Sequence, residues 1–316
     1  MDASLKLSIV VPCYNEEQVI EETNRRLQQL LEGWIRTALI THYEIVYVND
    51  GSRDSTLKKL KELANRNKNI KIISFSNNFG HQAALTAGLY HATGDAVVSL
   101  DADLQDPPEV IEEMIQAYRS GSEIVYGVRK ERKTDTFFKR ATALAFYKLM
   151  LFMGVNCFYN HGDCRLLSQR VLREFKKYEE INRFIRGIIP LMGFNYSIVE
   201  YDREKRYAGE TKYPLKKMIS LAIEGITSFS SVPLRIASLL GFMIFIGTLL
   251  LSIWVLIVTL GHASVPGWAS TVLPVYFLGG IQLIFFGILG EYIGKIYMEV
   301  KKRPLFIIKE KFNFED

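Results

Sequence analysis

The sequence predicts an α/β domain built on a mainly parallel sheet, followed by interfacial helices and two C-terminal transmembrane helices. Three observations lead to this prediction. Short apolar, β-branched runs alternate with amphipathic helical patterns, polar loops follow these runs, and two long stretches near the C-terminus lack charge. Strand, loop and helix repeated at this spacing are typical of parallel strands joined by helical crossovers.

Strands are predicted where apolar residues run together. The predicted strands cover residues 7–12, 44–49, 70–74, 97–100, 123–127 and 194–202. Helices, of which the first is amphipathic, separate the first four of them and are expected to end near Leu31, Ala64 and His91. Because parallel sheets bind ligands at the carboxyl ends of their strands, the loops that follow the strands are the expected location of a site.

The loop after the fourth predicted strand contains Asp101 and Asp103. Two carboxylates one residue apart at the end of a strand can share one hard cation with substrate phosphates, which is chemistry typical of Mg²⁺ or Mn²⁺. Asp106 is predicted to cap the following helix, with Glu109 at the capping-box distance. An isolated pair of this kind is more often a polar loop. Its position at the sheet edge favours a metal site.

Two other loops at the same edge contain side chains suited to a nucleotide. Tyr14 can stack on a base, and Glu16 and Asp50 can accept hydrogen bonds from a nucleobase or a ribose. Gly51 and Gly80 permit close backbone approach. Each loop alone is typical of an ordinary turn. Three such loops on one edge indicate a binding site.

The composition separates a globular part from an apolar part. Of the 316 residues 48% are hydrophobic and 23% are charged, and most of the chain beyond about residue 231 is strongly apolar. The net charge of +5 is concentrated in basic clusters within residues 129–140, 205–217 and 301–303, which suit phosphates or anionic lipids. No nucleic-acid-binding module is recognisable. The three cysteines lack metal-ligand spacing and are expected to be reduced, and no cleavable signal segment is expected.

Residues 236–260 and 268–290 contain no charged side chain and exceed the roughly 20 residues that span a hydrocarbon core. The connecting residues 261–267 contain neither Lys nor Arg, so the positive-inside rule places both termini and the globular domain in the cytoplasm. Residues 137–155 and 214–231 mix basic with bulky apolar side chains and are predicted to be interfacial helices, with a core helix as the alternative for the first. The expected parts are a globular domain 1–213, a juxtamembrane helix 214–235, spans 236–260 and 268–290, and a cytoplasmic tail 291–316.

Seven motifs occur in order: VPCYNEE, VNDGS, NNFGHQAALTAG, DADLQDPPE, GDCRL, RYAGETKY and GEYIGKIYMEVKKRP. Together with two terminal spans they resemble the polyprenyl-phosphate glycosyltransferases of glycosyltransferase family 2, which include dolichyl-phosphate mannose synthases and bactoprenol glucosyltransferases. The resemblance implies a GT-A fold, which is Rossmann-like. It also implies inverting transfer of a sugar from a nucleotide sugar to a polyprenyl phosphate at the cytoplasmic membrane face, and a homotetramer.

The resemblance assigns roles by motif position. The nucleotide-binding residues would be Pro12, Tyr14, Glu16, Asp50, Gly80, Asp101 and Ala102. Asp101 and Asp103 would hold Mg²⁺ or Mn²⁺, with Asp103 preferred as the direct ligand. The residues that hold the diphosphate or the lipid phosphate would be Arg129, Arg140, Arg206 and Lys212.

Asp163 would be the candidate catalytic carboxylate, and its role stays open. A phosphate acceptor is already anionic near neutral pH, since its second ionisation lies near ~6. Little is then left for a general base to do, and Asp163 could instead orient Arg165 or the acceptor.

Other functions are compatible with parts of the pattern. A processive polysaccharide synthase shares the sheet and the DxD, but it is expected to contain a Q-x-x-R-W motif, and none of Trp34, Trp254 and Trp268 lies in one. A non-catalytic membrane scaffold is expected to lack the carboxylates of the sheet edge, and a nucleotidyltransferase to have a glycine-rich basic N-terminal loop. The donor is open among UDP-glucose, UDP-N-acetylglucosamine and GDP-mannose, with UDP favoured.

Overall fold

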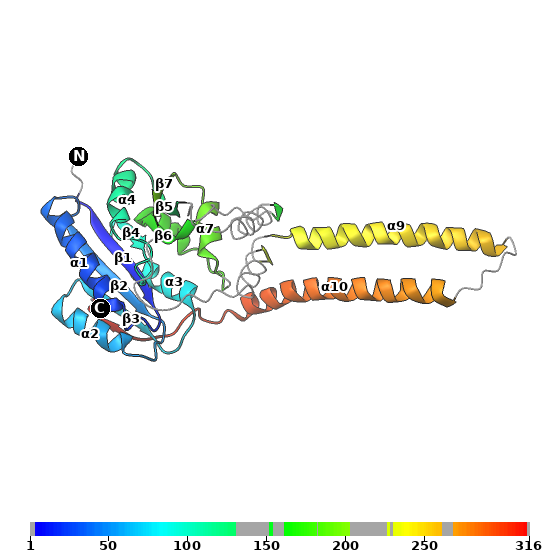
Figure 1. The fold of residues 1–316 in the computed structure, drawn as a ribbon, viewed down its shortest axis with the longest axis horizontal. Helices are drawn as coiled ribbons and strands as arrows, with labels where there is room; N and C mark the ends of the chain where they lie inside the picture. The colour runs from blue at the N-terminus through cyan, green and yellow to red at the C-terminus, as the bar shows by residue number, and fades with distance from the viewer. Residues whose placement is uncertain are drawn as a thin grey trace. The chain divides into compact units, whose positions relative to one another are not determined.

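The structure is a computed structural model that describes residues 4–130, 152–153, 161–181, 183–202, 226–227, 230–260 and 268–314. The chain divides into two compact units. One contains residues 1–147, 156–214 and 303–316, and the other contains residues 148–155 and 215–302. The first unit contains the sheet and the second contains two long helices (Figure 1).

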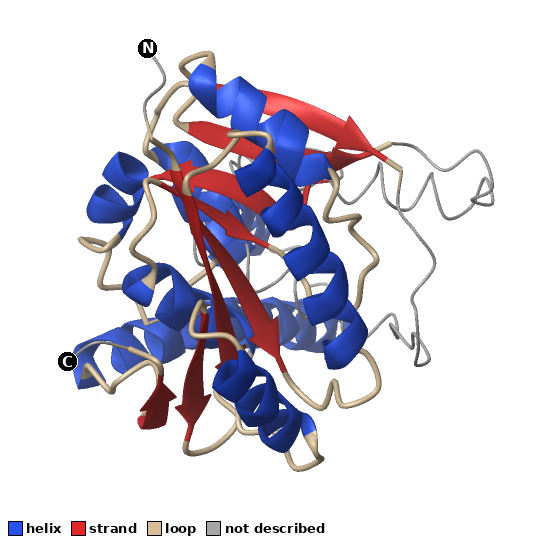
Figure 2. Cartoon of the chain, turned by 90° about the vertical axis from the view of Figure 1, so that its left-hand side faces the viewer, coloured by secondary structure: helices blue, strands red, loops and turns tan. Residues whose placement is uncertain are grey.

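The first unit is an α/β domain whose helices cover both faces of one twisted sheet (Figure 2). The strand order is β7-β5-β6-β4-β1-β2-β3-β8. Four of the seven pairings among the described strands are parallel, so the prediction of a mainly parallel sheet is confirmed. The strands are β1 Lys6–Cys13, β2 His42–Asn49, β3 Ile70–Phe75, β4 Ala96–Ser99, β5 Ile124–Arg129, β6 His161–Ser168, β7 Tyr196–Tyr201 and β8 Ile308–Phe312.

The helices of this unit bury one apolar face each. In α1 the apolar residues Ile20, Leu27, Leu31 and Trp34 recur at helical spacing and are all buried. The helix α3 is different, because seven of its eleven residues are buried and none of those is charged. The helices are α1 Ile20–Arg36, α2 Thr56–Arg66, α3 His81–His91, α4 Val110–Arg119, α6 Gln169–Phe175 and α7 Ile185–Leu191.

Two strands were not predicted from the sequence. Strand β6 runs antiparallel between β4 and β5, and its HGDCRLLS sequence contains charged residues that obscure the apolar pattern. Strand β8 lies within the stretch predicted to be a tail and pairs antiparallel with β3 at the sheet edge. Its IKEKF sequence has three consecutive charged residues, and its side chains alternate between half-buried and exposed, as in an edge strand with one exposed face.

The predicted cap of α4 is wrong. This helix begins at Val110 with Glu109 as its N-cap residue, and Pro107 and Pro108 supply the first carbonyl acceptors. The carboxylate of Asp106 instead accepts two hydrogen bonds from Arg129, each 2.9 Å long. The carboxylate of Glu109 accepts from Arg26 at 3.0 Å. At positions 106 and 109 the carboxylate forms a long-range ion pair in place of the predicted helix cap.

The second unit contains α9 Val232–Leu260 and α10 Trp268–Lys301, which include both predicted spans. They run side by side, with a Phe285 ring atom 3.7 Å from the position a Cβ would take on Gly241 (Figure 1). Within the described residues one helix, Phe277–Lys301, is long and apolar enough to cross a membrane, and Val232–Gly247 is a shorter apolar helix. The predicted interfacial helices lie almost entirely outside the described residues.

Candidate functional site

The loops that follow β1, β2 and β3 are bonded to one another at the carboxyl end of the sheet. The amide of Asp50 donates to the carbonyl of Cys13 at 2.9 Å, and the amide of Asn15 donates to Ser52 Oγ at 3.0 Å. These bonds hold the first loop against the second. The prediction that the loops of Tyr14 and Asp50 meet at one edge is therefore confirmed.

The side chain of Asp50 holds the loop that follows β3. This residue is only 3% exposed, and its two carboxylate oxygens accept from the amides of Phe79 at 2.7 Å and Gly80 at 2.9 Å. Burial raises the pKa of Asp50, and the two amide bonds act in the opposite direction. Asp50 thus fixes the backbone at residues 79–80, and its predicted contact with a nucleobase stays a prediction.

Glycine is required at positions 51 and 80 for different structural reasons. Gly51 has φ of +64°, and a Cβ on it would lie 2.4 Å from the carbonyl carbon of Asn77. The backbone at Gly51 is therefore in close approach to another loop of the protein, and its approach to a ligand stays a prediction. Gly80 has φ of +95°, which L side chains rarely adopt, but a Cβ on it would meet nothing within 4 Å. Gly80 is required for its backbone conformation and leaves space on its open side.

The remaining predicted nucleotide-binding residues divide into exposed and buried ones. Tyr14 is 43% exposed, so its ring is available for stacking. The amide of Glu16 donates to Thr56 Oγ1 at 2.8 Å, which holds the first loop against α2. Ala102 is buried and its carbonyl accepts from Thr23 Oγ1 at 2.7 Å. Pro12 lies within β1.

The loop after β4 carries the two predicted metal ligands. Asp103 is 8% exposed, and its Oδ1 accepts from the amide of Gln105 at 3.1 Å. Leu104, between them in the chain, has φ of +56°. A buried branched residue in the left-handed region is strained, and such strain persists where the surrounding structure holds a loop in a functional conformation.

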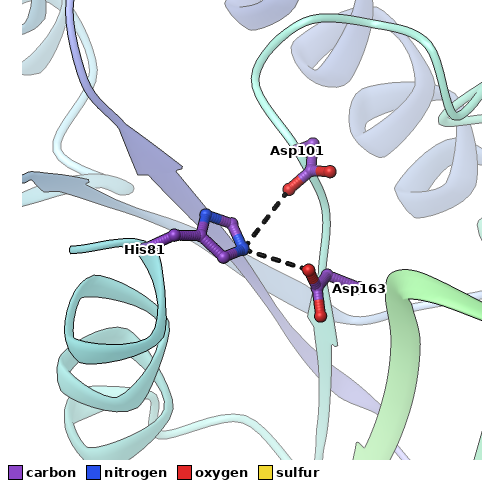
Figure 3. A group of neighbouring side chains, drawn as sticks. All are labelled: His81, Asp101 and Asp163. Atoms are coloured by element: carbon purple, nitrogen blue, oxygen red, sulfur yellow. Dashed lines mark hydrogen bonds and ion pairs between the residues drawn. The ribbon is translucent and has the colours of Figure 1, made fainter. Parts of the chain in front are cut away.

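Asp163, at the start of β6, is the most heavily bonded carboxylate of the site. Its Oδ1 accepts from Arg165 at 2.7 Å and from Arg186 at 3.1 Å. Its Oδ2 accepts from Arg186 at 2.7 Å and lies 3.2 Å from Nε2 of His81. The same His81 nitrogen lies 3.8 Å from Asp101 Oδ1, so the imidazole bridges the two carboxylates (Figure 3).

The two carboxylates that His81 bridges have opposite electrostatics. Burial acts to raise the pKa of Asp163, but the charge of Arg186 and the hydrogen bonds from His81 and Arg186 outweigh it and lower that pKa well below its ordinary value. Burial, together with the nearby carboxylates Asp163, Asp106 and Asp103, raises the pKa of Asp101 to about 6 against the favourable charge of His81. Asp163 is thus a poor proton acceptor, and the charge of His81 does not offset the burial of Asp101.

The prediction that Asp163 could orient Arg165 is supported by their 2.7 Å ion pair. The Arg165 side chain is fully buried, and its Nε and Nη1 have no hydrogen-bond partner within the described part of the chain. A buried guanidinium that keeps its charge depends strongly on its one carboxylate partner. Asp163 and Arg165 are therefore a structural pair as well as part of the site.

Arg129, predicted to hold a phosphate, is paired with Asp106, which is fully buried. The pair fixes the Arg129 guanidinium beside the loop after β4. Contact with a phosphate stays a prediction. The other predicted phosphate-binding residues, Arg140, Arg206 and Lys212, lie outside the described residues.

His81 and Arg186 are site residues that the sequence analysis did not select. His81 is the first residue of α3 and lies inside one of the recognised motifs, so its position after Gly80 was a usable signal. Arg186 lies on α7, whose sequence gave no sign that this helix faces the sheet edge. Only the fold brings Arg186 to Asp163.

The donor set fits a divalent cation. Within the described residues His81, Asp101 and Asp163 offer ligand atoms that all lie within 4.8 Å of one another. Asp103, the preferred ligand from the sequence, is not a member of this group. Carboxylate oxygens are the ligands that Mg²⁺ and Mn²⁺ prefer. The raised pKa of Asp101 shows that added positive charge would stabilise its ionised form.

Comparisons with known proteins find relatives that match most of the chain. The sequence pattern of Glycosyl transferase family 2 matches residues 8–176. "Uncharacterized glycosyltransferase YkoT" of Bacillus subtilis (strain 168) is 49% identical over 306 residues, which are 96% of this chain and 90% of that protein. "Bactoprenol glucosyl transferase" of Shigella phage SfII is 42% identical over 311 residues, 97% of this chain and 98% of that protein.

Among solved structures, glucosyl-3-phosphoglycerate synthase from Mycobacterium tuberculosis in complex with Mn²⁺, UDP-glucose and phosphoglyceric acid aligns with a TM-score of 0.48. Its sequence is 18% identical to this one, and the alignment covers 71% of this chain and 78% of the synthase chain.

Proposed function

Because this chain belongs to glycosyl transferase family 2, we propose that it transfers a sugar, from UDP-glucose or UDP-N-acetylglucosamine, to a polyprenyl phosphate at the cytoplasmic membrane face. The observation that carries the acceptor is the 42% identity, over nearly the full length of both chains, to a bactoprenol glucosyl transferase. That alignment covers 97% of this chain, so it extends beyond the α/β domain into the long helices. The proposal therefore rests on the whole chain.

In this reaction an oxygen of the lipid phosphate attacks the anomeric carbon of the sugar. The bond from that carbon to the diphosphate breaks, and the nucleoside diphosphate leaves with the electron pair. Attack from the opposite face inverts the configuration. The acceptor oxygen is already ionised near neutral pH, so no proton has to be removed from it. The chain has mainly to bind, to orient and to offset negative charge.

We assign Asp163 an orienting role, and its contacts support this assignment. Four hydrogen-bonding contacts occupy its carboxylate and hold it ionised. A base with a strongly lowered pKa accepts protons poorly. Asp163 holds Arg186 at the sheet edge, where its guanidinium would face the phosphates of the two substrates. We therefore favour Asp163 as the residue that positions Arg186.

Asp101 and Asp103 would hold Mg²⁺ or Mn²⁺, with Asp103 the preferred direct ligand. When bound, the ion supplies positive charge that stabilises the leaving diphosphate. The loops of Tyr14, Glu16 and Asp50 would hold the nucleoside. Arg129 would contact the diphosphate, with Arg140, Arg206 and Lys212 contributing from the predicted interfacial and basic segments.

The membrane arrangement belongs to the same proposal. The long helices α9 and α10 would form a hairpin that crosses the membrane twice. Both of its termini would lie in the cytoplasm, because basic residues precede the first predicted span and follow the second, and the connecting residues 261–267 contain neither Lys nor Arg. Such an anchor keeps the sheet edge near the lipid phosphate, which cannot move far from the interface. A homotetramer, implied by the family resemblance, would place several sites on one membrane patch.

The direct test is transfer of radiolabel from a panel of UDP- and GDP-sugars to undecaprenyl phosphate, with purified protein and Mg²⁺ or Mn²⁺. Label from one donor should enter the organic phase. The Asp103→Ala variant should lose this transfer. Glu113→Gln, which changes an exposed carboxylate on α4, should keep it.

Label from a GDP-sugar alone would correct the nucleotide and keep the acceptor. Label in a long polymer would favour a processive synthase. Folded protein that binds UDP and transfers from no donor would contradict the acceptor assigned here.

A further inference from the structure

The chain returns to the α/β domain after its last long helix. The residues that do so are 303–314, and we call them the C-terminal segment. They belong to the same compact unit as the sheet, and β8 within them pairs antiparallel with β3. Strand β3 leads directly into the loop of residues 76–80, whose backbone Asp50 binds. The C-terminal segment therefore lies beside the residues from which this loop begins.

The far end of the C-terminal segment is fixed to the start of β3 and to α2. Asn313 Nδ2 donates to the carbonyls of Ala64 at 2.9 Å and Ile70 at 2.8 Å. Lys61 lies 2.9 Å from the carboxylate of Glu310 and 4.5 Å above the ring of Phe312. These contacts involve no residue of the loop after β3.

The near end contacts the loop itself. The amide of Ser76 donates to the carbonyl of Ile307 at 3.0 Å. The ring of Phe306 stacks on Phe75 with centroids 5.0 Å apart and planes only 8° apart. The register shifts between Ser74 and Phe75, as at a β-bulge, and a bulge changes the direction in which a side chain points.

The stack continues to the residues that Asp50 binds. The ring of Phe79 meets Phe75 edge-on, with centroids 5.7 Å apart. The amides of Phe79 and Gly80 are the two that donate to Asp50. Three aromatic rings thus connect the C-terminal segment to the buried carboxylate of the proposed nucleoside site. Residues 76–80 form no helix or strand, so these contacts supply much of their order.

We propose that Phe306 is a positioning residue for the donor nucleotide, acting through Phe75 and Phe79 on the loop of residues 76–80. The proposal rests on the proposed function in one respect, that this loop binds the nucleoside. The C-terminal segment would then control the affinity for the donor nucleotide. This segment follows the proposed membrane anchor in the chain. The alternative is that the segment only covers the edge of β3.

Matched substitutions at the two ends of the C-terminal segment distinguish a role in positioning the loop from a role in covering the edge of β3. Phe306→Ala removes the ring that stacks toward the loop, and Phe312→Ala removes a similarly half-buried ring at the far end. Both delete the same atoms from the same segment. Phe306→Tyr keeps the stack, and Phe306→Leu keeps apolar volume without a ring in case the alanine variant folds poorly.

We would measure hydrogen exchange of the full-length protein in detergent, the dissociation constant for UDP, and the steady-state constants for the donor. Phe306→Ala should raise exchange of the Phe79 and Gly80 amides and weaken UDP binding, each by about tenfold, the scale of one aromatic pair. KM for the donor should rise more than kcat falls. Phe306→Leu should behave similarly, and Phe306→Tyr should restore wild-type values.

Phe312→Ala should lower the melting midpoint and leave exchange at residues 79–80 unchanged. Equal effects of Phe306→Ala and Phe312→Ala on the loop would overturn the proposal, because they would show simple loss of the edge strand. Unchanged exchange at residues 79–80 in Phe306→Ala would overturn it as well. If exchange rises as expected and the wild-type protein binds no nucleotide, the positioning contact stands and the proposed function fails.

Discussion

Two clusters built around acidic side chains lie at opposite ends of the same sheet and are balanced differently. Near the amino end of β2, Glu44 is 4% exposed and accepts from Ser8 Oγ at 2.5 Å and the amide of Thr93 at 2.6 Å. Lys71 completes this set with an ion pair of 2.6 Å. At the carboxyl end, Asp101, Asp103, Asp106 and Asp163 lie together.

The first cluster is electrostatically complete within the protein. Burial raises the pKa of Glu44, but hydrogen bonds from Lys71, Ser8 and Thr93 outweigh it, and the net result is a lowered pKa. At the other end Arg129 pairs with Asp106, and Arg165 and Arg186 pair with Asp163. Asp101 keeps a pKa raised to about 6. The charge of Glu44 is thus balanced within the protein, whereas that of Asp101, at the edge where we propose that ligands bind, is only partly offset by His81.

The largest effect should follow Asp103→Ala. If this carboxylate holds the metal that stabilises the leaving group, transfer should fall by about 10³-fold. The unfolding free energy should fall by no more than about 1–3 kcal/mol, because the amide of Gln105 loses its acceptor. Transfer assays and denaturant unfolding of the same preparation check both values. A variant that keeps its activity, or that unfolds, would remove the distinction between the two clusters.

A smaller loss is expected for Asp163→Asn. The amide can still accept a hydrogen bond from Arg186 but no longer carries charge, so transfer should fall about 10- to 100-fold and leave a measurable remainder. Stability should fall by about 2–3 kcal/mol because buried Arg165 loses its counter-charge. Equal and complete loss of transfer in Asp103→Ala and Asp163→Asn, with folding intact, would indicate that Asp163 takes part in the chemistry.

Glu44→Gln should affect stability alone. The substitution removes the charge that pairs with Lys71. It also places an amide NH2 group opposite one of the hydrogen-bond donors that bind Glu44, so the unfolding free energy should fall by about 1–3 kcal/mol. Transfer rate and UDP affinity should stay at wild-type values. Reduced kcat in this variant would show that the amino end of the sheet is coupled to the site.

The smallest effect is the pH dependence of Glu44. Its pKa is lowered on folding, so its stabilisation is fully present above the unfolded value of ~4.3 and is lost as pH falls through the lower folded value. The stability difference between wild type and Glu44→Gln should therefore be constant near neutral pH and shrink below about pH 4. Denaturant unfolding at several pH values measures it. A difference that grows with acidity would contradict the assigned partners.

The sheet and its polar edge were predictable because both follow from local sequence. Apolar runs such as that of β4 mark the parallel strands, and the loops after them contain Tyr14, Asp50 and Asp101 in order. Strand β6 was missed because Asp163 and Arg165 interrupt its apolar pattern, and the pairing that makes their burial tolerable is visible only in the fold.

Long-range partners were the part that sequence could not supply. Asp106 was predicted to cap α4 because a local rule fits it, but Arg129, 23 residues away, binds it instead. Arg186 reaches Asp163 from a short helix with no recognisable motif. The C-terminal segment was predicted to be a tail. Three consecutive charged residues obscure the strand pattern of β8, and only its pairing with β3 shows that it belongs to the sheet.

The most direct test of the central claim is a titration of Mn²⁺ followed by electron paramagnetic resonance, with and without UDP. We would compare wild type with Asp103→Ala and with Glu44→Gln as a matched change to a buried carboxylate. Wild type and Glu44→Gln should bind Mn²⁺ more tightly when UDP is present, and Asp103→Ala should lose this binding. Equal Mn²⁺ binding by all three proteins would contradict the claim that the carboxyl end of the sheet holds the metal and the nucleotide.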